Sequence, residues 1–330
     1  MTSVQVFFPL LLLLAIQKKV HLRYMESWAV ELATAEQHDD PVGIMVTFYN
    51  GQNNPTLPNN FLKCISSLML YSTGFVRLYV ITDKFGKRFI QESINGGRLN
   101  YSNFEVTFYD KDEIAARTSE LLGAHFYRHF RHSERAPYGN DLYFTSIVSH
   151  RIFPNISRLI FLDIDLQFRD DIKQLYNLFD QFGEEQMIGL ALEQQPVYLN
   201  IFYTYREANP STHLGSPPPD GFSGFNSGVL LAHLDNMRNS AKYNSLLNIP
   251  TIDALAEKYS FKGHLGDQDF YTLIAAEHPE LFYQLPCGWN VQLCEWWLSA
   301  YGADIFDKYH KCDMDVKIYH GNCNSPIPDD

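Results

Sequence analysis

The chain has little positive charge. It contains 26 Lys and Arg against 38 Asp and Glu in 330 residues, which gives a formal net charge of −12. This balance opposes binding to a polyanionic backbone, so we expect no nucleic-acid partner and look for local cation sites instead. The sequence also lacks internal repeats and Gly/Ser-rich linkers, and 45% of its residues are hydrophobic. These features favour one folded domain with a substantial core.

An apolar run near the start, "VQVFFPLLLLLAI" at 4–16, is interrupted by Pro9. It is shorter than the roughly 20 residues that a helix needs to span a bilayer. Basic residues follow the run, and no small-residue cleavage pattern is obvious, so a membrane anchor and a cleaved signal both stay open. We predict an apolar segment with a short stem at 1–41, followed by one catalytic domain at 42–330.

Cysteine is scarce, and its distribution is uneven. Five cysteines occur, and we expect Cys64 to be a buried free thiol within a helical pattern. The other four fall in the last quarter and allow three pairings; they lack the close C-x-x-C spacing of structural zinc sites. Two glycosylation sequons, Asn100-Tyr-Ser and Asn155-Ile-Ser, also indicate an oxidising compartment. The four late cysteines are Cys287, Cys294, Cys312 and Cys323.

Short β-rich runs alternate with helical patterns over the first two thirds of the chain. The segment "NNFLKCISSLMLYS" carries apolar residues at helical spacing. This alternation predicts an α/β fold with a doubly wound, mostly parallel sheet, in which ligands gather at the carboxyl ends of the strands. After residue 193 the pattern becomes irregular, and the Pro-rich stretch at 212–224 predicts a loop. The predicted strands are 43–50, 75–83, 104–110, 158–165 and 186–192.

The stretch "LIFLDIDLQF" at 159–168 places Asp163 and Asp165 at the end of an apolar strand. On a regular strand the two side chains point to opposite faces, but where the strand breaks both can reach one divalent cation. An unpaired charge there would be costly, which favours a cation site. Aspartyl-phosphate chemistry is disfavoured, because the pair comes midway through the chain and Leu166 and Gln167 follow it.

Five motifs occur in an order that resembles the retaining family-8 glycosyltransferases, which have a Rossmann-like GT-A fold. The carboxyl-terminal motif and the cysteine arrangement are most similar to members that transfer xylose from UDP-xylose to xylose-glucose O-glycans. Their acceptors are EGF-like repeats of Notch-type proteins. The resemblance therefore implies a Mn²⁺-dependent, single-pass enzyme of the endoplasmic reticulum membrane with a lumenal catalytic domain. The motifs are "FLDID", "GFNSGVLL", "GHLGDQDF", "LPCGWN" and "YHGNCNSPIP".

The resemblance also implies a metal site. Asp163, Asp165 and His320 would hold manganese, a set of oxygen ligands with one imidazole that suits this ion. The ion would neutralise charge on the departing UDP. Many family members carry a lysine shortly after the histidine, but "HGNCNSP" has none. We expect the amide of Asn322 to contact the diphosphate instead.

Donor and catalytic residues follow from the same resemblance. Gln268 would lie beside the anomeric carbon, and Asp267 would accept hydrogen bonds from xylose hydroxyls. An amide is a poor nucleophile, so we predict same-face substitution, with the departing β-phosphate taking the acceptor's proton. The other residues implied in donor binding are Thr47, Phe48, Tyr49, Ile164, Asp165, Asn226, Ser227, Gly228 and Gly266.

We expect Trp289 and Asn290 on the acceptor side, since indole faces stack well on sugar rings. The resemblance further implies the disulfides Cys287–Cys312 and Cys294–Cys323. A glucoside xylosyltransferase, or another family-8 UDP-sugar transferase, is the alternative within this chemistry. A carbohydrate-binding protein that has lost turnover is the alternative of a different class.

Overall fold

The computed structural model describes residues 40–131 and 140–328. The apolar run predicted at 4–16 lies outside the described residues. Among the helices of the described ranges, none combines the length and the apolar character needed to cross a membrane.

A seven-stranded sheet forms the centre of the compact unit at 42–330, in the order β3-β2-β1-β4-β7-β6-β8. Each strand pair in it is parallel except those made by β7, which runs antiparallel to both of its neighbours. The predicted doubly wound, mostly parallel α/β sheet is therefore confirmed. The strands are β1 Val42–Phe48, β2 Val76–Thr82, β3 Phe104–Asp110, β4 Arg158–Leu162, β6 Ile188–Leu192, β7 Phe225–His233 and β8 Phe282–Gln284.

Apolar side chains on both faces of the strands explain why helices cover both sides of this sheet. In β7, Leu230 belongs to one buried cluster and Leu231 to the other, as the two-residue period of a strand requires. The cluster around Leu230 includes residues of α4 (111–122), α5 (145–152) and the helices α9–α12 between 234 and 275. The cluster around Leu231 includes residues of α2 (56–71), α3 (84–95) and α6 (172–177). The sheet therefore separates two cores.

The helices vary in length, and the longer ones are amphipathic. In α2 the buried residues include Phe61, Ile65 and Leu68, which follow the 3.6-residue period. The predicted helix in this segment is thus confirmed. The helices are α2 Thr56–Tyr71, α3 Lys84–Asn95, α4 Lys111–Leu122, α5 Thr145–Ile152, α6 Ile172–Asn177, α7 Val197–Ile201, α8 Tyr203–Ala208, α9 Leu234–Asn239, α10 Ala241–Leu246, α11 Ile249–Lys258, α12 Asp267–Ala275, α13 Leu298–Tyr301 and α14 Ala303–His310.

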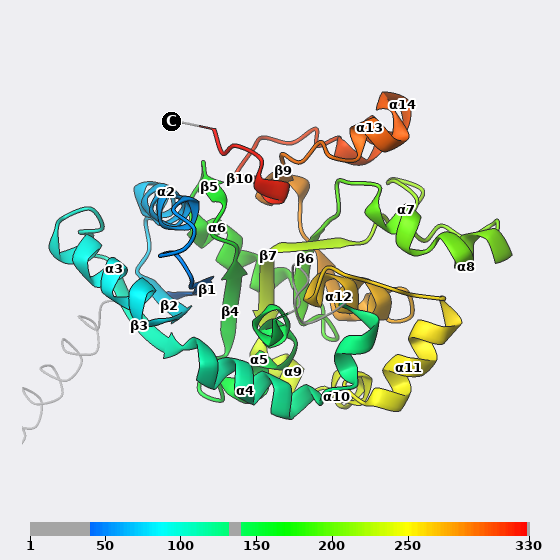
Figure 1. The fold of residues 1–330 in the computed structure, drawn as a ribbon, viewed down its shortest axis with the longest axis horizontal. Helices are drawn as coiled ribbons and strands as arrows, with labels where there is room; N and C mark the ends of the chain where they lie inside the picture. Colours follow the sequence, from blue (N-terminus) through cyan, green and yellow to red (C-terminus); the bar gives the residue numbers. More distant parts are fainter. Residues whose placement is uncertain (1–39, 132–139, 329–330) are drawn as a thin grey trace, which may run out of the picture. The chain divides into compact units, whose positions relative to one another are not determined.

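A second, three-stranded sheet joins segments that are far apart in the sequence. It has the order β5-β10-β9, with β5 Leu166–Phe168, β9 Val291–Gln292 and β10 Ile318–His320. Figure 1 shows this small sheet beyond the end of β4, because β5 starts only a short turn after β4 ends. The late part of the chain is thereby held beside the carboxyl edge of the central sheet.

Leu231 tests how much the central strands contribute to stability. Its side chain is fully buried, whereas Leu70 on α2 is 67% exposed. We expect Leu231→Ala to lower the free energy of unfolding by about 2–5 kcal/mol, because the substitution leaves a cavity. Leu70→Ala, the matched control, should change it by less than about 0.5 kcal/mol. Urea unfolding measures both, and equal losses would contradict the placement of β7 in the core.

Candidate active site and metal centre

The aspartate pair lies where the strand breaks. β4 ends at Leu162 and β5 begins at Leu166, so Asp163 and Asp165 occupy the turn between two sheets. The N–H of Asp163 donates to the carbonyl of Gly228 at 2.9 Å, and the carbonyl of Asp165 accepts from the N–H of Gly321 at 2.8 Å. Backbone hydrogen bonds from two distant segments therefore fix the turn, and both side chains face one point.

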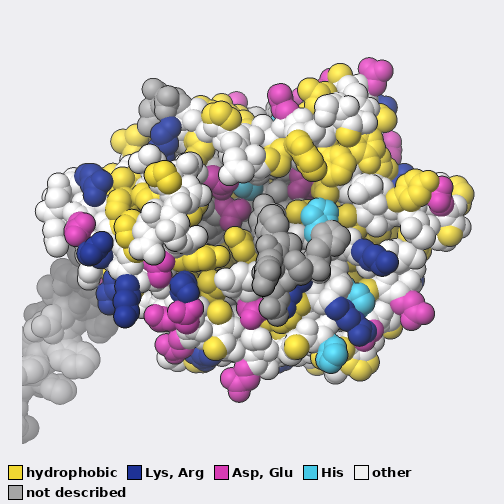
Figure 2. Space-filling view, viewed as in Figure 1, with side chains coloured by type: hydrophobic (Ala, Val, Ile, Leu, Met, Phe, Trp, Pro, Cys, Tyr) yellow, Lys and Arg dark blue, Asp and Glu magenta, His cyan; other side chains and the backbone are white. Residues whose placement is uncertain are grey.

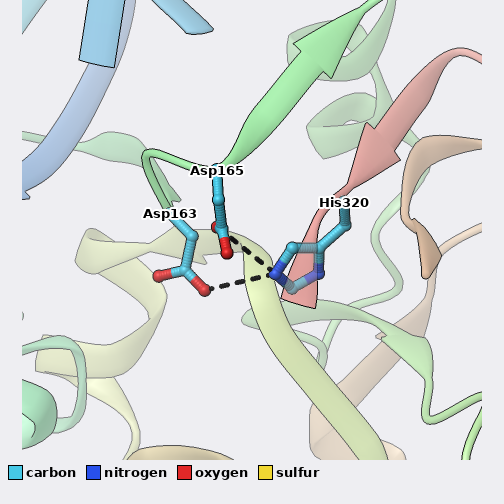
Figure 3. Close-up of side chains that lie close together, drawn as sticks. All are labelled: Asp163, Asp165 and His320. Carbon is cyan, nitrogen blue, oxygen red and sulfur yellow. Dashed lines mark ion pairs between the residues drawn. The ribbon is translucent and has the colours of Figure 1, made fainter. Parts of the chain in front are cut away.

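His320, the last residue of β10, faces both carboxylates. Its Nε2 lies 3.5 Å from Asp163 Oδ2 and 3.6 Å from Asp165 Oδ1, as Figure 3 shows. One ligand atom from each of the three residues fits within 4.8 Å of the others. The structure thus brings together the three side chains that the sequence motifs predicted as metal ligands.

The other ring nitrogen of His320 makes a hydrogen bond that orients the imidazole. Nδ1 lies 2.9 Å from Asn290 Oδ1. Because the amide oxygen only accepts, Nδ1 donates to it, and Nε2 is the nitrogen that faces the two aspartates. Metal-binding histidines are oriented by such a second partner.

The electrostatics of this cluster favour a bound cation. Burial disfavours the charged form of His320, but Asp165 and Asp163 outweigh burial and raise the pKa of the ring. Burial raises the pKa of Asp165, and Asp163 raises it further, although His320 acts in the opposite sense. A divalent cation relieves the repulsion between the carboxylates. Two carboxylates and an imidazole form a donor set that such an ion accepts, so the residues fit a metal.

A local irregularity in β7 makes room for the imidazole. Leu190 of β6 pairs with Leu230, but the next residue, Ala191, pairs with Asn226, so β7 bulges between these positions. Gly228 lies in the bulge, and a Cβ atom there would overlap the ring of His320. The second glycine of "GFNSG", Gly228, is therefore needed for the close approach of the histidine ring.

The residues of "GDQD" lie beside this bulge. Gly266 has a φ of 73°, a conformation that favours glycine, and α12 begins at Asp267. Asp267 accepts hydrogen bonds from Ser146 and from Ser227, the latter at 2.9 Å. Burial raises the pKa of Asp267 to about 7, although both serines oppose the shift.

Gln268 is buried and its amide is bonded at both ends. Its Oε1 accepts from the N–H of Ser227 at 3.3 Å, and its Nε2 donates to Glu193 Oε2 at 3.0 Å. Sequence reasoning missed both Glu193 and Ser146. Glu193 follows the buried strand β6, so the carboxyl-end rule that identified Asp163 could have found it. Ser146 lies on α5, and nothing in its local sequence marks it.

Three of the predicted contact residues are buried in the structure. Trp289 is 3% exposed and belongs to a core cluster, and Lys317 Nζ lies 4.9 Å from the centre of its ring. Asn290 is fully buried and serves His320. Phe48 is fully buried as well, and its ring stacks on that of Phe61 with 4.8 Å between the ring centres, so it packs in the core. Local sequence does not distinguish such buried residues from exposed neighbours in the same motifs.

The remaining predicted donor residues lie around the metal cluster. Val46 pairs with Leu162, so Thr47, near the end of β1, lies at the edge where Asp163 follows β4. Tyr49 and Ile164 are half-buried and pack against the two cores. The side-chain oxygen of Asn322 accepts from the N–H groups of Leu293 and Cys294, which leaves its Nδ2 as the group for any diphosphate contact.

Two disulfides hold the late segments together. Cys287 pairs with Cys312, and Cys294 pairs with Cys323. These are the pairs that the family resemblance implies. Cys323 lies just after His320, and Cys294 lies just after β9. The second disulfide therefore links the segment that carries His320 to the segment that follows β9. Cys64 is buried and free, as predicted.

Acidic and histidine side chains are visible inside a hollow near the middle of the molecular face in Figure 2. The exposed fraction of the Asp163 side chain is 60%, that of Asp165 is 27% and that of His320 is 3%. The cluster thus has one solvent-facing ligand and one buried ligand. Solvent and ligands therefore reach the cluster from the Asp163 side.

Comparisons with known proteins identify relatives of this chain. The model of "Glycosyl transferase family 8" matches residues 59–315. Human xyloside xylosyltransferase 1 is 45% identical over 227 residues, which cover 68% of this chain and 58% of that protein. The crystal structure of the mouse protein in its apo form has a TM-score of 0.83 at 36% identity, and the match covers 87% of this chain and 100% of the mouse chain.

A more distant structure shares the fold. The galactosyltransferase LgtC, in complex with donor and acceptor sugar analogs, has a TM-score of 0.52 at 14% identity; the match covers 84% of this chain and 86% of LgtC. These neighbours confirm the GT-A architecture predicted from the motifs. The sequence match spans somewhat more than half the length of the human and mouse relatives.

Gly228→Ala tests whether His320 is a metal ligand. The added methyl group would displace the imidazole, so we expect affinity for Mn²⁺ to fall at least about tenfold. Gly183→Ala is the matched control, because the nearest atom to its new Cβ is the flexible Gln186 Oε1 at 3.6 Å. Electron paramagnetic resonance of free Mn²⁺, recorded without nucleotide sugar, measures both variants. Unchanged affinity in a folded Gly228→Ala protein would exclude His320 from the site.

Proposed function

The chain belongs to glycosyl transferase family 8, and from this premise we propose that it is a retaining xylosyltransferase that uses UDP-xylose and Mn²⁺. The acceptor we propose is a xylose-glucose O-glycan on EGF-like repeats of Notch-type proteins, extended through an α-1,3 linkage. One observation carries the proposal: Asp163, Asp165 and His320 converge within 4.8 Å beside Gln268 and its partners. The choice of xylose follows the 45% identity to a xyloside xylosyltransferase.

The proposed metal site joins the two sheets. Asp163, Asp165 and His320 would hold the cation, which when bound neutralises charge on the leaving diphosphate. Asn290 keeps the His320 ring in the required tautomer. The Asn322 amide nitrogen takes the diphosphate contact that a lysine makes in many family members. A single amide donor gives less charge compensation than a lysine, which makes the cation more important in this chain.

Gln268 and Asp267 face the sugar in this proposal. The Gln268 amide is neutral and weakly nucleophilic, so it stabilises the sugar by hydrogen bonding without forming a bond to carbon. Both oxygens of Asp267 already accept from Ser146 and Ser227, so this carboxylate orients hydroxyl groups. We therefore retain same-face substitution, in which the departing β-phosphate takes the proton of the acceptor hydroxyl. A covalent xylosyl-enzyme adduct detected by mass spectrometry would contradict this mechanism.

An exposed tryptophan joins Trp289 as a proposed acceptor contact. Trp296 is 71% exposed, and its ring lies 5.1 Å from that of Trp297. Both follow Cys294, whose disulfide joins this segment to the segment after His320. An exposed indole beside the metal-bearing segment offers a stacking face for a sugar ring.

We also propose that the catalytic domain lies in the lumen of the endoplasmic reticulum, attached through the N-terminal segment. Two disulfides require an oxidising environment. Asn100 and Asn155, the asparagines of the two sequons, are both exposed. Exposure on the protein surface is what a glycosylation acceptor needs.

A donor screen against a xylosyl-glucosyl EGF-like repeat tests the proposed reaction. We expect one added pentose, read as a mass shift, with UDP-xylose and Mn²⁺, and little product with UDP-glucose. EDTA should abolish transfer, and Asp165→Asn should lower kcat by about 100-fold or more, because charge on the leaving group is no longer offset. Binding of UDP-sugars without hydrolysis or transfer would instead support a non-enzymatic carbohydrate-binding protein.

The same assay tests the acceptor face. Trp296→Ala should raise KM for the EGF repeat and leave hydrolysis of UDP-xylose unchanged. Phe75→Ala is the control, since Phe75 is also exposed but precedes β2 at the opposite edge of the sheet. If both substitutions have the same effect on KM, Trp296 does not contact the acceptor.

Expression of the full chain in a eukaryotic secretory system tests its location. We expect peptide N-glycosidase F to increase gel mobility, because the exposed Asn100 and Asn155 would carry glycans. Asn100→Gln and Asn155→Gln should each remove one mobility step. A protein that shows no such shift and has free thiols at its four late cysteines would contradict a lumenal location.

A further inference from the structure

We propose that Glu193 is a positioning residue for glycosyl transfer: its carboxylate orients the Gln268 amide and links it, through Asn226 and Asn290, to His320. The inference rests on the proposed function. It adds a role for a residue that the sequence motifs do not contain.

Glu193 lies directly after β6, and only 3% of it is exposed. Its N–H donates to the carbonyl of Gly224 at 2.9 Å, and its carbonyl accepts from the hydroxyl of Ser223 at 2.8 Å. The backbone is therefore held at both polar groups. A carboxyl group buried at such a place is costly unless hydrogen bonds satisfy it.

Donors surround the Glu193 carboxyl group. Its Oε2 accepts from Asn226 Nδ2 at 3.1 Å and from Gln268 Nε2 at 3.0 Å, and its Oε1 accepts from the N–H of Gln195 at 3.0 Å. All three partners can only donate through these atoms, which is the environment of an ionised carboxylate. Burial raises the pKa of Glu193 to about 7, while these donors oppose the shift.

The hydrogen bond between Gln268 and Glu193 selects the orientation of the Gln268 amide. An amide can exchange its oxygen and nitrogen positions by turning over, and the two orientations differ in what they present to a ligand. Glu193 accepts only from the nitrogen, so the Gln268 oxygen must face the N–H of Ser227, at 3.3 Å. That second hydrogen bond is long. Glu193 therefore supplies the stronger of the two restraints on Gln268.

The hydrogen bond between Asn226 and Glu193 connects the carboxylate to the cluster of proposed metal ligands. Asn226 Oδ1 accepts from Asn290 Nδ2 at 2.9 Å, and Asn290 Oδ1 faces His320 Nδ1 at 2.9 Å. In this series of hydrogen bonds Asn226 sets the orientation of the Asn290 amide. The oxygen of Asn290 then accepts the proton of His320 Nδ1. However, the N–H of Gly228 also donates to Asn226 Oδ1, at 3.1 Å. Asn226 is thus held twice, whereas Gln268 depends mainly on Glu193.

This difference between the restraints on Asn226 and Gln268 predicts how a Glu193 variant should behave. Loss of the carboxylate should impair the step in which Gln268 acts and should affect metal binding much less. A residue needed only for folding would change activity and metal affinity together, in proportion to the fraction of protein that is folded. The ratio between kcat and metal affinity therefore separates the two roles.

The test compares Glu193→Met, Glu193→Asp and Glu193→Gln in the full chain. Methionine fills the space without an acceptor, and aspartate keeps the charge but is one methylene too short to reach both amides. We expect both to lower kcat by about 10–100-fold with KM for UDP-xylose within about threefold. Glutamine presents a carbonyl oxygen to Asn226 and Gln268 but turns its NH2 group towards the N–H of Gln195, so Glu193→Gln should keep clearly more of kcat than the other two variants without reaching the wild-type value. Affinity for Mn²⁺, read by electron paramagnetic resonance without nucleotide sugar, should change less than about threefold in all variants.

Two results would overturn the inference. The first is a kcat within twofold of wild type in Glu193→Asp, which folds more readily than the methionine variant. The second is a loss of kcat in Glu193→Gln that equals the loss in Glu193→Asp. If the wild-type protein transfers no xylose, the proposed donor is wrong, and the same variants are then compared in UDP-glucose hydrolysis. Failure of the donor assignment is thereby distinguished from failure of the role of Glu193.

Discussion

The structure depends on the approach of two carboxylates to one buried imidazole. Asp163 and Asp165 repel each other, and His320 loses hydration when it is buried, so the cluster does not form by attraction between side chains alone. Backbone hydrogen bonds hold the three residues in place: Asp163 N–H to Gly228, and Gly321 N–H to Asp165. Because the fold imposes this proximity, a cation relieves a repulsion that is already present.

Strand pairing and a disulfide between segments distant in the sequence hold His320 close to the two aspartates. The small sheet pairs β10 with both β5 and β9, so the strand that ends at His320 lies between β9 and the strand that follows the aspartates. The disulfide between Cys294 and Cys323 anchors the segment that follows His320. A disulfide limits the conformations of the unfolded chain more than those of the folded chain. The histidine is therefore positioned by strand pairing and by a covalent link, although it lies close to the carboxyl terminus.

Behind the metal ligands lies a layer of buried amides and one carboxylate. Asn290, Asn226, Glu193 and Gln268 satisfy one another in sequence, from the imidazole to the first turn of α12. Buried polar groups are tolerated when each has a partner, and a fully paired network is rigid. The proposed metal ligands and the residue proposed to face the sugar thus share one hydrogen-bonded network, which links the orientation of His320 to that of Gln268.

The local sequence by itself determined five strands of the central sheet, the helix α2 that packs on it and the position of the aspartate pair. Apolar runs alternating with helical periods specify a parallel sheet, and Asp163 and Asp165 stand where such a strand must end. Motif resemblance added His320 and Gln268. Only the tertiary structure decided which residues of each motif face the site: Trp289, Asn290 and Phe48 are buried, whereas Glu193 joins the site without any motif. The physical reason is that burial and hydrogen-bond partners arise from segments distant in sequence, and a local pattern carries no information about the atoms that the fold later places beside it.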